Sequence, residues 1–229
     1  MGLITNITTS YFFNLNKSLS EIRKDCKTIF FTPEGELFKS KGAYGGIEQV
    51  CKSRNDCNYI IKAIPLSSPG IHDTFIREIF LLPIMSELGV SPKIEDYFIC
   101  FNTGFVVMEK WDGTLSDLLK SNKDMIMTTK YLEKLSKVIN KMHDVGIIHN
   151  DLHASNIVYR VNKDGEYDYA IIDFGLSLYF KNKNIILNKH MITTERSLRY
   201  FYPPCDYYKL QESIEKHSIQ KLFLLHFIQ

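Results

Sequence analysis

The spacing of the apolar residues divides the chain into two parts with different periods. From residue 28 to about residue 108, apolar residues form short runs rich in β-branched side chains, which is typical of strands. Clear examples are Tyr59–Ile64, Pro92–Cys100 and Gly104–Met108. Pro33-Glu34-Gly35 predicts a turn earlier in the same part. This part is therefore predicted to consist mainly of β-strands.

One helix is expected within the β-rich part. It would follow Pro69-Gly70, with Asp73 as its N-cap, and continue through Phe80. Pro83 would kink or end it, because proline has no backbone N–H to donate to the preceding turn.

After residue 109 the pattern becomes helical, with one hairpin. The hairpin is predicted from the apolar runs Ile157–Val161 and Tyr167–Ile172, which flank the turn signal Lys163-Asp164-Gly165. Residues 1–27, with a short helix predicted over Ser18–Cys26, are assigned to an N-terminal extension. A long helix before the hairpin is predicted from apolar residues on one helical face: Tyr131, Leu132, Leu135, Val138, Ile139 and Met142.

Polar side chains follow these apolar runs. Asp151 and Asn156 come soon after Ile147-Ile148, and Asp173 directly follows the second hairpin strand. A carboxylate and a carboxamide in one tight loop suit phosphoryl transfer, since Asp151 could accept a hydroxyl proton while Asn156 holds a divalent ion. Asp173 would bind the ion that bridges nucleotide phosphates, because hard cations take oxygen ligands. Either His-x-Asp-Leu at 149–152 or Asp-Phe-Gly at 173–175 could occur by chance in a loop or turn. The two together, in this order, favour a catalytic site.

The segments 147–157 and 171–176 resemble the catalytic loop and the Asp-Phe-Gly element of the protein-kinase family. The resemblance covers about residues 36–206 and implies a bilobal α+β fold. A small antiparallel β-rich lobe with one helix would span 28–108, and a mainly helical, shortened lobe would span 109–229. Ala154-Ser155-Asn156 and the segment 173–180 are most similar to vaccinia-related and casein-kinase-like Ser/Thr kinases, so a viral or minimal member is implied.

The resemblance also implies where ATP would bind. Lys62 would contact the α- and β-phosphates and pair with Glu78. The alternatives are that Lys62 is an edge-strand lysine that points to solvent and that Arg77-Glu78 is solvated surface. Met108 would be the gatekeeper. The hairpin 40–47 would lie over the phosphates, with Ser40 in place of the family's first glycine. The other implied nucleotide-site residues are Ser40, Gly42, Ala43, Tyr44, Gly45, Ile47, Ile60, Glu109, Trp111 and Val158.

Three departures from the family pattern carry further expectations. Asn150 replaces the arginine of many regulated kinases, so activity is expected to be independent of activation-loop phosphorylation. His153 replaces the usual lysine and is similar to small-molecule kinases of the aminoglycoside and choline type. Cys205 stands where the family's activation segment has a glutamate. Asp206 could instead begin a helix and would then be the aspartate that braces the catalytic loop. His149 is expected to anchor that loop by hydrogen bonding, because no second metal ligand lies at suitable spacing.

Composition narrows the class of protein without identifying it. The 229 residues are 45% hydrophobic and 24% charged, which is typical of a soluble globular chain, and no apolar run is long enough to span a bilayer. A net charge of +2 gives no argument for nucleic-acid or membrane partners. Five scattered cysteines favour reduced thiols and a cytoplasmic location. Met1-Gly2 lacks the hydroxyl expected at position six for myristoylation, and the N-terminus lacks a signal-peptide pattern.

We therefore expect an ATP-dependent protein kinase that transfers the γ-phosphoryl group to Ser/Thr hydroxyls with Mg²⁺, or with Mn²⁺ as a substitute. ATP and a protein substrate would be its partners, and a further partner would cover an exposed apolar segment such as Leu222–Leu225. Two alternatives remain open. His153 favours a small-molecule phosphotransferase, while Ser40 and Pro83 favour a pseudokinase that acts as a binding module.

Overall fold

A computed structural model describes residues 30–36, 46–53, 55–121, 129–179 and 203–215. The chain divides into two compact units, residues 1–83 with 93–110 and residues 84–92 with 111–229. Both units mix helices with antiparallel strands, so the predicted α+β class is confirmed.

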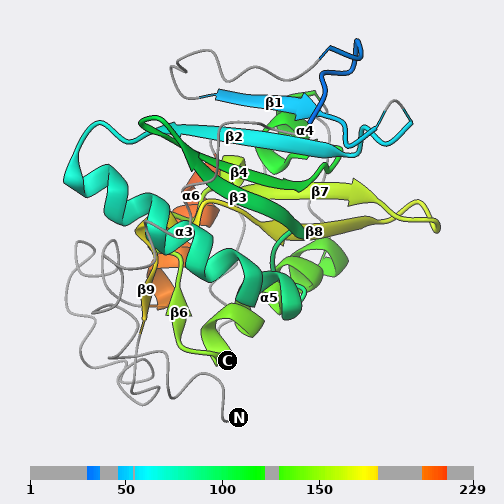
Figure 1. The fold of residues 1–229 in the computed structure, drawn as a ribbon. Coiled ribbons are helices and arrows are strands. Elements are labelled where there is room, and N and C mark those ends of the chain that lie inside the picture. The colour runs from blue at the N-terminus through cyan, green and yellow to red at the C-terminus, as the bar shows by residue number, and fades with distance from the viewer. Residues whose placement is uncertain (1–29, 37–45, 54, 122–128, 180–202, 216–229) are drawn as a thin grey trace. The chain divides into compact units, whose positions relative to one another are not determined.

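The first unit is built on a four-stranded antiparallel sheet. In chain order its strands are β1 (Gly46–Val50), β2 (Tyr59–Pro65), β3 (Ile94–Cys100) and β4 (Thr103–Glu109), and in space they follow the order β1-β2-β4-β3 (Figure 1). Lys62 of β2 is paired with Ile47 on one side and with Val106 on the other. Lys62 therefore lies on an inner strand, and the alternative of an edge-strand lysine is wrong.

The two faces of this sheet pack against different partners, because successive side chains of a strand point to opposite faces. One face forms a core around Phe30, Ile61, Phe105 and Val107. On the other face, the ring of Phe75 packs so closely on Gly104 that a Cβ there would come within 2.6 Å of the ring. The absence of a side chain at position 104 thus sets how closely this part of the unit packs.

Phe75 belongs to helix α3 (Pro69–Glu87), which is longer than the sequence predicted. The helix begins four residues before Asp73, so that residue is not its N-cap. It also continues past Pro83, and the expectation that it would end there is wrong. The missing hydrogen bond is compensated by tertiary packing, since Ile79, Leu82 and Met85 on either side of the proline are buried.

Cys51 and Cys57 form a disulfide. Cys51 directly follows β1 and Cys57 precedes β2, so the β1–β2 hairpin brings the two residues together. The expectation of reduced thiols is therefore wrong for this pair. The turn predicted at Pro33-Glu34-Gly35 is present, closed by a hydrogen bond from the Gly35 N–H to the Thr32 carbonyl.

Some predicted features lie outside the described residues. They are the helix 18–26, the segment 40–45 with Ser40, Gly42, Ala43, Tyr44 and Gly45, and the segment 222–225.

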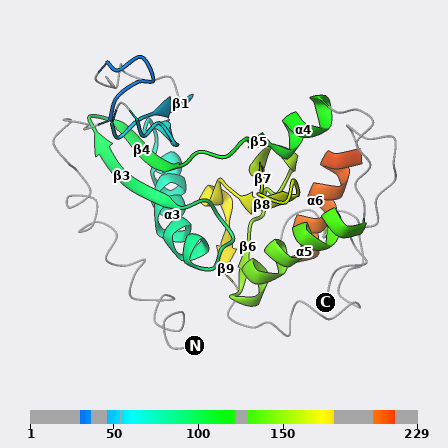
Figure 2. The same ribbon diagram turned by 90° about the vertical axis from the view of Figure 1, so that its right-hand side faces the viewer.

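The second unit contains three helices within its described residues: α4 (Leu115–Ser121), α5 (Thr129–Asp144) and α6 (Pro203–Glu215). The apolar face predicted for α5 is buried at Leu132, Leu135, Ile139 and Met142. Helices α5 and α6 lie side by side (Figure 2), and the Tyr207 hydroxyl of α6 donates to Asn140 Oδ1 of α5 at 2.6 Å. No helix among the described residues combines the length and apolar character needed to cross a membrane.

Two small sheets complete the second unit. One contains β5 (Gly113–Thr114), β7 (Ile157–Val161) and β8 (Tyr167–Ile171), and the other pairs β6 (Ile147–Ile148) with β9 (Leu178–Tyr179). The predicted hairpin is the β7–β8 pair, with Ile157 opposite Ile171. Short 3₁₀ turns, Ala154–Asn156 and Phe174–Leu176, follow β6 and β8.

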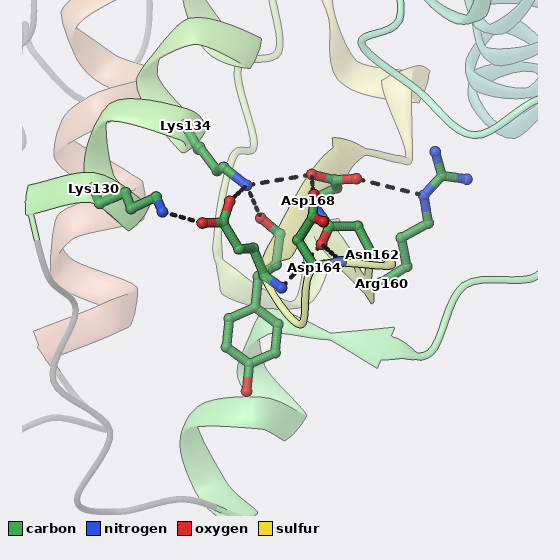
Figure 3. A network of polar contacts seen from close by, with 8 residues as sticks. Lys130, Lys134, Arg160, Asn162, Asp164 and Asp168 are labelled. Atoms are coloured by element: carbon green, nitrogen blue, oxygen red, sulfur yellow. Dashed lines mark hydrogen bonds and ion pairs between the residues drawn. The ribbon is translucent and has the colours of Figure 1, made fainter.

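A polar network attaches the β7–β8 hairpin to α5 (Figure 3). Lys134 donates to Glu166 Oε2 at 2.9 Å and to the Tyr167 carbonyl at 3.1 Å, and Lys130 also pairs with Glu166. These two lysines hold the pKa of Glu166 at about 2, mainly by hydrogen bonding to its carboxylate.

Candidate active site

Lys62 and Glu78 form an ion pair within the first unit. Lys62 Nζ donates to both carboxylate oxygens of Glu78, at 2.8 and 3.0 Å. Glu78, on α3, is only 1% exposed, whereas the Lys62 side chain is 20% exposed. A buried carboxylate requires a partner of opposite charge, so the pair fixes the lysine head relative to the sheet.

The other residues that the resemblance assigns to the nucleotide lie in both units. In the first unit, Ile47 of β1 is exposed, Ile60 of β2 faces Met108 of β4, and the Glu109 N–H donates to the Lys93 carbonyl at 2.8 Å. In the second unit, Val158 is buried on β7 and the guanidinium of Arg160 lies 4.6 Å from the centre of the Trp111 ring.

The loop after β6 is held by a buried carboxylate of α6. Asp206 accepts the backbone N–H of His149 at 2.9 Å and that of Asn150 at 2.9 Å, one on each oxygen. His143 Nε2 of α5 lies 3.0 Å from the same carboxylate. Asn150 adopts φ of 64°, a conformation that asparagine tolerates better than most residues, so the Asp206 bonds stabilise a sharp turn.

His149 anchors the loop, as its lack of companion metal ligands had suggested. The ring is fully buried, with Nε2 2.8 Å from the Ile172 carbonyl and Nδ1 3.3 Å from the Asp151 N–H. Burial lowers the pKa of His149, so the neutral ring donates from Nε2 and accepts at Nδ1. The ring also packs 5.2 Å from that of Phe174.

Asp151 and Asn156 are joined through the loop backbone. Asn156 Nδ2 donates to the Asp151 carbonyl at 2.9 Å and lies 3.2 Å from His153 Nε2. Because the NH₂ group is used in this way, Oδ1 is the side-chain atom of Asn156 that could bind a cation. The Asp151 carboxylate is 43% exposed and therefore accessible to a substrate.

The β7–β8 hairpin places Asp173 next to the same loop. The Ile172 N–H donates to the Asn156 carbonyl at 3.0 Å, so the residue before Asp173 is bonded to Asn156. Asp173 has φ of 67°, again a conformation accessible to aspartate, and begins the turn in which Phe174 is fully buried.

These residues suit a hard divalent ion shared with phosphate oxygens. One carboxylate and one carboxamide oxygen provide oxygen ligands, and phosphate would supply others. Among the described residues, no group of three or more His, Cys, Asp or Glu side chains forms a metal site made of protein ligands alone.

Sequence reasoning anticipated Asp206 but missed two other residues of α6. Ser213 Oγ accepts the Ala154 N–H at 3.0 Å, and Lys209 contacts both Asn150 and Asp151. Asp206, Lys209 and Ser213 are spaced at i, i+3 and i+7, which places them on one helical face. That spacing was the available signal.

The model of the protein kinase domain family matches residues 40–204. This chain belongs to the protein kinase family. The match includes Lys62, Glu78, the loop with Asp151 and Asn156, and Asp173.

Relatives of this kinase-family chain come from varied organisms. A protein of Acanthamoeba polyphaga mimivirus named as a serine/threonine-protein kinase is 30% identical over 63% of this chain and 26% of its own length. Calcium-dependent protein kinase 4 of Plasmodium falciparum is 25% identical over 73% of this chain and 31% of its own. A bifunctional tRNA threonylcarbamoyladenosine biosynthesis protein of Methanococcus maripaludis is 31% identical over 61% of this chain and 23% of its own length. This chain thus spans less than a third of the length of each of these three relatives.

Proposed function

We propose that this chain is an ATP-dependent protein kinase that phosphorylates Ser/Thr hydroxyls. The observation that carries the proposal is the hydrogen bond from Asn156 to the Asp151 carbonyl, which holds a candidate base and a candidate cation ligand in one short turn. The family match and the ion pair between Lys62 and Glu78 support the same conclusion. The two relatives named as protein kinases, one of them as a serine/threonine-protein kinase, favour a protein acceptor.

In this proposal each residue has a defined task. The hydroxyl oxygen of the acceptor bonds to the γ-phosphorus, the bond from that phosphorus to the bridging oxygen breaks, and ADP leaves. Asp151 orients the hydroxyl and accepts its proton. Lys62 holds the α- and β-phosphates, with Glu78 keeping its ammonium in place.

Asn156 and Asp173 would hold Mg²⁺, or Mn²⁺ in its place. A bound divalent ion neutralises phosphate charge. The protein contributes the oriented oxygen atoms, and most of the rate enhancement would come from positioning and electrostatic stabilisation.

Radiolabelled ATP tests the proposal directly. Wild type, Lys62→Met and Asp173→Asn would be incubated with acidic and basic protein substrates, using Lys137→Met on the exposed side of α5 as the control lysine change. We expect the wild type and the control to label protein, and each site variant to lose at least ~100-fold, the usual loss when a preorganised charge is removed. Label transfer that is unchanged in both site variants would contradict the proposal.

A small-molecule acceptor is the second candidate. His153 Nε2 lies 3.7 Å from Asp151 Oδ2, and His153 stands where the sequence departs from Ser/Thr kinases. The relative from Methanococcus maripaludis is not named a protein kinase. Sugars and amino alcohols in the same assay distinguish the two candidates. A thermal shift by ATP and Mg²⁺ without any ATP consumption would instead indicate a pseudokinase.

A further inference from the structure

One face of α6 follows the candidate catalytic loop from its beginning to its 3₁₀ turn. Asp206 binds the backbone of His149 and Asn150, and Ser213, two turns later, binds that of Ala154. Lys209 lies between them on the same face, so its side chain reaches the middle of the loop. Helix α6 thus positions a loop more than fifty residues away in sequence.

Lys209 brings a positive charge to the candidate base. Its Nζ donates to the Asn150 carbonyl and lies 3.9 Å from Asp151 Oδ1. The Lys209 side chain is 23% exposed, about half the exposure of the Asp151 side chain. Because the backbone carbonyl holds the ammonium, its position does not depend on the carboxylate that it faces.

Within the loop, His153 also lies near Asp151, but its nearer nitrogen has a second partner. His153 Nε2 lies 3.7 Å from Asp151 Oδ2 and 3.2 Å from the Asn156 amide NH₂, which can only donate. When Nε2 accepts that bond, it does not donate to the Asp151 carboxylate. A lysine ammonium group only donates, and His153 occupies the place of a loop lysine in related kinases.

We propose that Lys209 is a positioning residue that supplies, from α6, a fixed positive charge beside Asp151. It keeps the Asp151 carboxylate turned toward the acceptor hydroxyl and offsets the negative charge that gathers there during phosphoryl transfer. The inference rests on the proposed function, but it holds whether the acceptor is a protein or a small molecule.

Lys209→Met, Lys209→Gln and Lys209→Arg would be compared with wild type by ATP consumption with saturating acceptor, with Lys137→Met as the control. We expect Lys209→Met and Lys209→Gln to lower kcat by ~30-fold or more, since small misplacements of catalytic groups cost up to ~100-fold. KM for ATP should change by less than about twofold, because the residues that Lys209 contacts, Asn150 and Asp151, are not assigned to the nucleotide in the proposed function. Lys209→Arg should recover most of kcat, and the control should match wild type.

The possible results distinguish failure of this inference from failure of the proposed function. Wild type that consumes no ATP overturns both. Active wild type with unchanged kcat in Lys209→Gln overturns the inference alone, and so does an Arg variant as impaired as the Met variant. If Lys209→Met fails to fold, Lys209→Gln and Lys209→Arg still decide, because both can donate a hydrogen bond to the Asn150 carbonyl and only Arg carries the charge.

Discussion

The two units fix their candidate catalytic side chains in different ways. In the first unit, Lys62 extends from an inner strand and meets Glu78 directly, side chain to side chain. In the second unit, the loop with Asp151 is held mainly through its backbone, by the carboxylate of Asp206. A strand already sets the direction of its side chains, so one ion pair is enough. A loop with positive φ has no such ladder and requires acceptors from another element.

Removing Asp206 should have the largest effect on this comparison. Asp206→Ala leaves the N–H groups of His149 and Asn150 without their acceptor in a buried site, at a cost of about 4 kcal/mol in the free energy of unfolding. Urea denaturation measures the loss. Asp206→Asn keeps one acceptor oxygen and should lose roughly half as much. Equal stability of the Ala variant and wild type would mean that the loop does not depend on α6.

The Lys62–Glu78 pair should show strong direct coupling. A double-mutant cycle with Lys62→Met and Glu78→Gln should give a coupling free energy of about 2 kcal/mol, because the bond is charge-assisted and Glu78 is buried. The measurement is again urea denaturation of the four proteins. Strictly additive effects of the two substitutions on the free energy of unfolding would mean that Lys62 and Glu78 do not stabilise each other.

The contact between α3 and β4 can be tested with one methyl group. Gly104→Ala should destabilise the protein by about 1.5 kcal/mol, since its Cβ would meet the Phe75 ring at 2.6 Å. Gly70→Ala is the matched control, because a Cβ there has nothing within 4 Å, and Ala should be neutral or better in a helix. Thermal unfolding distinguishes them, and equal midpoints for the two variants would argue against close packing at this contact.

The smallest expected effect is on the pH dependence of stability, at the β7–β8 hairpin that precedes Asp173. The pKa of Glu166 is depressed in the folded protein to about 2, from an ordinary value of 4.5. The carboxylate therefore stabilises the fold above pH 4.5, and this contribution is lost as the pH falls from 4.5 toward 2. Glu166→Gln should make the urea midpoint less dependent on pH between 5 and 3 than in wild type. Glu133→Gln, at an exposed position of α5, is the matched control for the loss of one carboxylate, and a change as large as that of Glu166→Gln would contradict the prediction.

The elements that the sequence predicted well are those whose neighbours in space are also neighbours in the chain. The β7–β8 hairpin was expected over 157–161 and 167–172, and the structure has it at Ile157–Val161 and Tyr167–Ile171. Alternation of side chains and a glycine turn depend on local geometry alone. The boundaries of α3 failed for the opposite reason, since burial around Pro83 outweighed a local preference against proline.

By itself, the sequence determined the α+β class, the family motifs and the residue types that a phosphotransferase requires, because periodicity and motif spacing are properties of the chain. Only the tertiary structure decided that Glu78 meets Lys62, that Cys51 meets Cys57, and that α6 places Lys209 beside Asp151. These contacts join residues from different elements, and their distances depend on helix packing and strand register. A one-dimensional pattern does not contain those quantities.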